Sequence, residues 1–213
     1  MTARQKKSVL AGPRRRGRPP GAGLLADRED LLTAAESLIR STGPDVTMEA
    51  LAAAANVTKP ILYRNVGDRD AVVAALADRF VTRINAAASS VFDAKAAGRT
   101  QIHRVITSYL EVVADERNIY LFVVSDGSGS DGVMRVLQLA DRSAKPFGAL
   151  LRHIGVADAD AATLSYAFIG ALQFATFRWF RDADQALDEL ADQLTDLWWS
   201  GISGAVRTPK HRP

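Results

Sequence analysis

Apolar residues recur at intervals of three and four positions along most of this chain, which is the spacing of one face of an α-helix. Gly and Pro interrupt the pattern between successive stretches and separate one helix from the next. The expected helices cover residues 27–41, 47–55, 58–66, 68–93, 102–117, 118–125, 131–154, 158–179 and 184–206. Pro146 falls inside the seventh helix and is expected to kink or break it. The pattern therefore predicts an all-α fold.

The stretch TMEALAAAANVTKPILYRNV, residues 47–66, predicts two short helices joined by a tight turn. Thr47 can cap the first helix, and Asn56 tolerates the left-handed backbone of a turn. Thr58 can cap the second helix, whose first turn accepts Pro60 because no intrahelical bond is lost there. The apolar face of the first helix is formed by Met48, Leu51, Ala52 and Ala55. This layout is a helix-turn-helix.

The string VTKPILYRNVGDRDAV, residues 57–72, resembles the recognition helix of the TetR family of bacterial transcription regulators and the entry to that family's fourth helix. The resemblance covers about residues 27–76. The family usually has His-Phe where this chain has Asn65-Val66, so an amide takes the place of the histidine expected to contact phosphate. The resemblance implies a small DNA-binding head followed by a larger helical body.

A recognition helix reads sequence with the residues that enter the major groove first. Lys59 can donate to guanine, while Pro60 and Ile61 can touch a thymine methyl group. Arg64 can serve either base or phosphate recognition. The resemblance assigns phosphate contacts to Thr47, Thr58, Tyr63, Asn65 and Arg69.

The net charge of +3 hides an uneven distribution of basic residues. Residues 1–20 carry seven basic residues and no acid, and the remainder carries 20 basic against 24 acidic residues. This arm is expected to be disordered and to attract phosphates. Within it Arg16-Gly17-Arg18-Pro19 resembles an AT-hook core, in which Arg16 and Arg18 would lie in an A·T minor groove. The alternative is a nonspecific basic tail.

The remaining chain predicts a body that binds a ligand and forms a dimer. By resemblance, the last two helices form a homodimer interface, so the operator should be an inverted repeat. An apolar pocket for a small-molecule effector is expected among the middle helices. Its candidate ligand-binding residues are Tyr109, Phe122, Phe147, Phe174, Phe177 and Trp179. The alternative for each aromatic side chain is a place in the core.

The domain organisation follows from these assignments. We expect a disordered basic arm at residues 1–25, a helix-turn-helix domain at 26–67, a ligand-binding and dimerisation domain at 68–206, and a disordered tail at 207–213. The leading function is a dimeric repressor released from its operator by an apolar effector. An architectural binder of A·T-rich DNA, without an effector, is the alternative.

A nucleotide-dependent enzyme is a third, disfavoured hypothesis. GSGSDG at residues 127–132 matches a dinucleotide-binding loop, but the pattern requires a βαβ unit and no further strand candidate follows the apolar run at 118–125. That run is better interpreted as a short buried helix, and the glycines as an exposed loop. We therefore expect no enzymatic activity and no cofactor.

Composition excludes other classes of site. Cysteine is absent, which removes disulfides and thiolate chemistry, and the three histidines lie far apart, so no metal site is expected. No signal peptide is recognisable, and the longest uncharged stretch, residues 161–177, is too short and too polar to span a membrane. These features predict a cytoplasmic protein.

Overall fold

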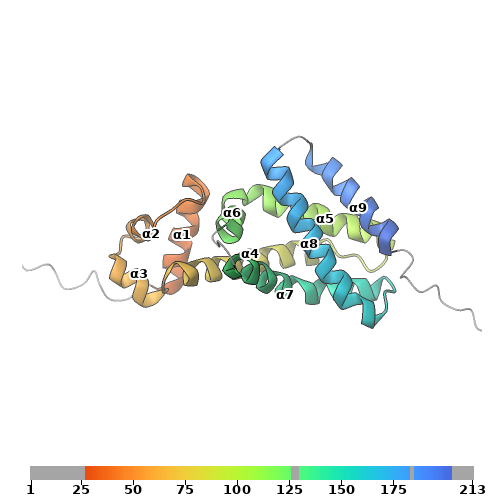
Figure 1. Ribbon diagram of the computed structural model, residues 1–213, viewed down its shortest axis with the longest axis horizontal. Helices are drawn as coiled ribbons and strands as arrows, with labels where there is room; N and C mark the ends of the chain where they lie inside the picture. The colour runs from red at the N-terminus through yellow and green to blue at the C-terminus, as the bar shows by residue number, and fades with distance from the viewer. Residues whose placement is uncertain (1–26, 126–129, 183–184, 203–213) are drawn as a thin grey trace, which may run out of the picture.

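The computed structural model describes residues 27–125, 130–182 and 185–202. Every regular element in these ranges is a helix, which confirms the all-α prediction. In order they are α1 (Arg28–Thr42), α2 (Met48–Ala54), α3 (Lys59–Asn65), α4 (Arg69–Ser90), α5 (Gly98–Asp115), α6 (Arg117–Ser125), α7 (Ser130–His153), α8 (Asp158–Asp182) and α9 (Leu187–Ile202). Helices α1 to α3 form one end of the molecule, and α4 runs from them into the body (Figure 1).

The turn between α2 and α3 forms as its residues predict, with one exception. The Ala50 N–H donates to Thr47 Oγ1 at 3.2 Å, which confirms the cap of α2. Asn56 has φ 54°, so the left-handed turn position is also confirmed. Thr58 stands at the N-cap of α3, but its hydroxyl makes no capping hydrogen bond, so that part of the prediction is wrong. Thr58 is exposed at this position.

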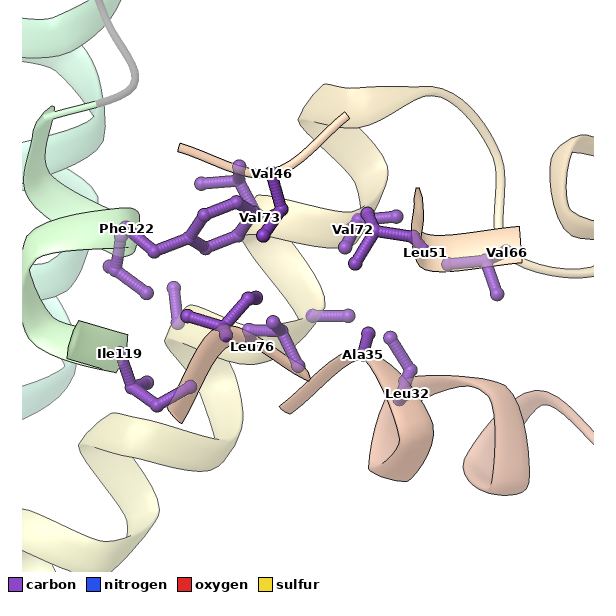
Figure 2. Close-up of a cluster of buried hydrophobic side chains, with 14 of the residues drawn as sticks. Leu32, Ala35, Val46, Leu51, Val66, Val72, Val73, Leu76, Ile119 and Phe122 are labelled. Carbon is purple, nitrogen blue, oxygen red and sulfur yellow. The ribbon is translucent and has the colours of Figure 1, made fainter. Parts of the chain in front are cut away.

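The core of the head is shared with elements outside the helix-turn-helix. Figure 2 shows Leu32 and Ala35 of α1 facing Leu76 of α4, with Ile119 and Phe122 of α6 closing one side. Both α6 side chains are almost completely buried. The helix-turn-helix therefore depends on α4 and α6 for its packing, and a displacement of either helix would disturb the head.

A second core holds the body together. It gathers buried side chains from α5, α7, α8 and α9, and its centre is the stacked pair Phe147 and Phe168, whose ring centroids lie 3.8 Å apart. Helix α4 has 22 residues, which span about 33 Å, and its side chains pack against both cores. It is therefore the longest direct connection between head and body.

Pro146 was expected to kink or break its helix, and the break does not occur, because α7 continues through this residue. A proline removes the hydrogen bond to the carbonyl four residues earlier, here that of Arg142. Asn85 Nδ2 of α4 donates to this carbonyl at 3.5 Å and supplies a replacement partner, although a weak one. Tertiary packing thus keeps the helix intact where local propensity disfavours it.

The apolar run before the glycine-rich motif forms α6, as predicted, and not a strand. Residues 127–129 of that motif lie outside the described residues. Ser130 to Gly132 belong to the first turn of α7. No strand occurs in the described ranges to complete a βαβ unit.

Candidate DNA-binding head and ligand cavity

Helix α3 exposes three of its six predicted DNA-binding residues, and the other three are half-buried. Leu62 is 1% exposed and anchors the helix to the head core. Around it Pro60, Tyr63 and Arg64 are exposed, and Tyr63 reaches 45% exposure. Lys59, Ile61 and Asn65 are half-buried. The structure therefore places a phenol, a guanidinium, an amide and apolar groups beside one another on a short, protruding helix.

Lys59 has a partner that the sequence did not reveal. Its ammonium group donates to the carboxylate of Glu49, which lies in the first turn of α2. The hydrogen bond from Lys59 lowers the pKa of Glu49 and raises the pKa of Lys59. Lys59, the first residue of the recognition helix, is thus ion-paired across the turn with Glu49. The exposed carboxylate of Glu49 can itself accept a hydrogen bond from a base.

Arg69 is held by the head. Its Nη1 donates to the carbonyl of Val46, and its guanidinium carbon lies 5.1 Å from the ring centroid of Phe122. These contacts join the loop before α2, the start of α4 and helix α6. The phosphate contact assigned to Arg69 stays a prediction, and so do those of Thr47, Thr58, Tyr63 and Asn65. Arg16 and Arg18 lie outside the described residues.

A cavity of about 970 Å³ lies in the body between α4, α5, α6, α7 and α8. Four of the six predicted ligand-binding residues line it, namely Tyr109, Phe147, Phe174 and Phe177. Phe122 does not, because it is buried in the head core. Trp179 does not either, since its indole nitrogen donates to the carbonyl of Gln185 at 3.0 Å and its ring stacks on Phe180. The volume is at the upper end of ordinary small-molecule sites.

Comparison with known proteins identifies the head. Residues 31–76 match the family model for bacterial regulatory proteins of the tetR family. An uncharacterized HTH-type transcriptional regulator of Mycobacterium tuberculosis is 30% identical over 189 residues, covering 84% of this chain and 78% of that protein. The chain belongs to the TetR family. It is a transcription regulator that binds DNA through its helix-turn-helix, as the sequence pattern predicted.

Solved structures of TetR regulators share the whole architecture. A TetR-like transcriptional regulator from Rhodococcus sp. RHA1 has a TM-score of 0.60 and 26% identity, covering 88% of this chain and all of that chain. A tetR-family regulator from Streptomyces coelicolor has a TM-score of 0.64 at 16% identity, covering 84% of this chain and 81% of that chain. The second likeness concerns the fold alone.

In this TetR regulator Tyr109 and Tyr120 contribute two hydroxyl groups to the cavity wall. The Thr176 hydroxyl donates to the Tyr109 hydroxyl at 3.4 Å, and the Tyr120 hydroxyl donates to the backbone carbonyl of Gln173 at 3.4 Å. Burial raises the pKa of Tyr109 to about 12 and raises that of Tyr120 as well. Both phenols therefore remain protonated at neutral pH. Tyr120 is not among the predicted ligand-binding residues, because it lies in the apolar run 118–125, which the sequence predicted only as a buried helix.

The described ranges show neither a metal-binding cluster nor a membrane-spanning helix. They contain no cluster of three histidine, aspartate or glutamate side chains placed to hold a metal ion. None of their helices is long and apolar enough to cross a membrane.

Proposed function

We propose that this TetR regulator is a dimeric repressor that occupies an inverted-repeat operator and leaves it when an apolar small molecule fills the cavity. The observation that carries the proposal is the position of the cavity. Its wall includes Phe80 of α4 and Tyr120 of α6, and these two helices also complete the core of the head. A molecule that favours a different spacing of α4 and α6 would therefore act on the head as well.

Dimerisation is supported by the apolar side chains that α8 and α9 expose. Phe174 of α8 is 76% exposed and Leu197 of α9 is 64% exposed. Large apolar groups left in water on adjacent helices are typical of a surface that another chain covers. A symmetric pair would present two α3 helices about 34–36 Å apart, or a multiple of that distance, which matches half-sites separated by whole turns of DNA.

At the operator, α3 would enter the major groove, with Lys59, Pro60 and Ile61 reading bases. Tyr63 and Asn65 would contact phosphates, and Thr47 would do so from the start of α2. Release is then a population shift, and its size is limited by the difference in ligand affinity between the two spacings of the heads. A ligand that binds both spacings equally would fill the cavity without releasing DNA.

The test begins with the DNA that flanks the gene. Fluorescence anisotropy of labelled fragments should show tight, saturable binding to one inverted repeat, and light scattering on the same complex should give two protein chains per site. Apolar compounds are then added to the preformed complex, and anisotropy should fall. Broad coverage of A·T-rich fragments, or a monomer on DNA, would contradict the proposal.

A further inference from the structure

We infer that the cavity takes an elongated, electrically neutral apolar molecule that carries one hydrogen-bonding oxygen, such as a long-chain alcohol or ester, and discriminates against the corresponding carboxylate. This inference rests on the proposed function because it concerns the same cavity. It goes further by naming the chemistry of the effector.

The length of the ligand follows from the wall that α4 provides. Six α4 side chains line the cavity, and they extend from Phe80 to Ser89, which is about 14 Å along the helix axis. Phe92, just after the end of α4, continues the lining. On α7 the lining begins at Leu137 and continues to His153. Asn85 of α4 contacts Arg142 of α7, and Phe92, just after α4, contacts His153 at the end of α7, so the two helices run beside each other in the same direction. The cavity is therefore elongated along both helices.

The charge of the ligand follows from the side chains in the wall. Among the described lining residues there is no aspartate, glutamate, lysine or arginine. His153 is the one histidine among the lining residues that the structure describes, and it is exposed, with its ring edge-on to Phe92 at 5.1 Å. A carboxylate inside such a wall would lose its hydration without gaining a cationic partner, which is far more costly than burying a neutral oxygen.

The place for a neutral oxygen lies where the two tyrosines meet α8. Their hydrogen bonds to Thr176 and to the Gln173 carbonyl are both 3.4 Å long, beyond the usual range for a hydroxyl donor. The Gln173 side-chain nitrogen, in the same wall, is buried without a hydrogen-bond partner. Hydrogen-bonding capacity is therefore unsatisfied here, and an incoming oxygen can accept a shorter bond from Tyr109 than the ones present.

The probes are dodecanol, methyl dodecanoate, dodecanoate and dodecane, titrated into the full chain by calorimetry without DNA. The buffer is held at about pH 8, where carboxylates are ionised and free imidazole is neutral. We expect the alcohol and the ester to bind at least about tenfold more tightly than dodecanoate. Equal or tighter binding of dodecanoate than of dodecanol would overturn the inference. If that binding is then lost in His153→Ala, the anionic head group lies at the exposed end of the cavity.

Two matched variants locate the oxygen site. Tyr109→Phe removes one hydroxyl and keeps the ring, so dodecanol should bind roughly three- to tenfold more weakly while dodecane is unaffected. Tyr166→Phe is the control, because Tyr166 also lines the cavity but its hydroxyl is exposed and donates to Asp141. Equal losses of dodecanol affinity in both variants, or none in Tyr109→Phe, would contradict the assigned site.

The two proposals can fail separately. If dodecanol binds as expected but leaves the DNA complex intact, the effector role fails and the chemistry of the cavity stands. If charged compounds release the DNA and neutral ones do not bind, the inference on ligand chemistry fails and the effector role stands.

Discussion

A cluster of ion pairs joins the head to the body, and the carboxylate of Glu36 is at its centre. The Glu36 side chain is 7% exposed and lies 3.1 Å from Arg79 and 3.0 Å from Arg83, both on α4. Glu116, which precedes α6, lies 2.9 Å from Arg40 and 3.3 Å from Arg83. Helices α1 and α4 and the start of α6 thus share one network of charges. Replacing Glu36 by Ala should destabilise the protein considerably.

The magnitude depends on how well the arginines are shielded from water. Removing one partner of a fully buried ion pair costs about 3–5 kcal/mol. The Arg79 and Arg83 side chains are 21% and 31% exposed, so water can partly solvate them after the substitution. We therefore expect Glu36→Ala to lower the free energy of unfolding by roughly 2–4 kcal/mol. For a chain of this size that corresponds to a fall in melting temperature of roughly 5–15 °C.

Glu29→Ala is the matched control. Glu29 also pairs with Arg79 but its side chain is 63% exposed, so its removal should cost less than about 1 kcal/mol. Both variants are followed by far-ultraviolet circular dichroism during thermal and denaturant unfolding, at one protein concentration because the stability of the proposed dimer would depend on it. Equal losses in the two variants would show that burial of Glu36 does not determine the strength of the network.

Three further predictions concern the arm, the turn after α3 and the cavity. Residues 1–20 hold seven basic residues, and deleting them should reduce the slope of log K for DNA binding against log salt concentration by up to about six per arm. An unchanged slope would exclude phosphate contacts by the arm. Gly67→Ala should cost more than about 1 kcal/mol of unfolding free energy, since Gly67 has φ 115° and an added Cβ would lie 2.6 Å from that of Ala71; unaltered denaturation would contradict this. The pKa of Tyr109 is raised from 10 to about 12 in the folded state, so the contribution of its protonated phenol to stability is complete below pH 10 and is lost as pH rises through 12. Tyr109→Phe should therefore lose less free energy of unfolding between pH 10 and 12 than the unmodified protein, as measured by denaturant titration.

The sequence predicted the fold well because most of its signals are local. The i, i+3, i+4 repeats located the helices of the described ranges apart from α6, which was interpreted from an apolar run, and Thr47 and Asn56 specified the start of α2 and the turn after it. Each of these effects depends on a few neighbouring residues and on backbone geometry. Two local signals failed. Thr58 makes no capping hydrogen bond, and Pro146 lies inside an unbroken helix, where the Arg142 carbonyl that it leaves unpaired accepts a hydrogen bond from Asn85, about sixty residues away along the chain.

The site was harder to predict because its contacts are distant in sequence. Aromatic residues in the body can line the cavity or fill a core, and the pattern alone does not separate Phe177, which lines the cavity, from Phe122, which packs in the head. The pairing of Lys59 with Glu49 required the angle between α2 and α3. The contact of Arg69 with Val46 required the position of the loop before α2. These are tertiary relationships that helical periodicity does not encode.

Helix α6 explains how one short segment can serve both sites. Tyr120 and Phe122 both belong to the core of the head, but only Tyr120 also lines the cavity. Tyr120 packs against Phe80 and Phe177, with ring centroids 6.1 and 5.7 Å away, and Phe122 lies beneath Arg69. Residues two positions apart in a helix are separated by about 200° around its axis, so the two rings point to nearly opposite sides. Under the proposed function, a ligand that displaces Tyr120 must also move Phe122, because both side chains belong to one rigid helix. The head then responds to the cavity without any contact between the ligand and the helix-turn-helix.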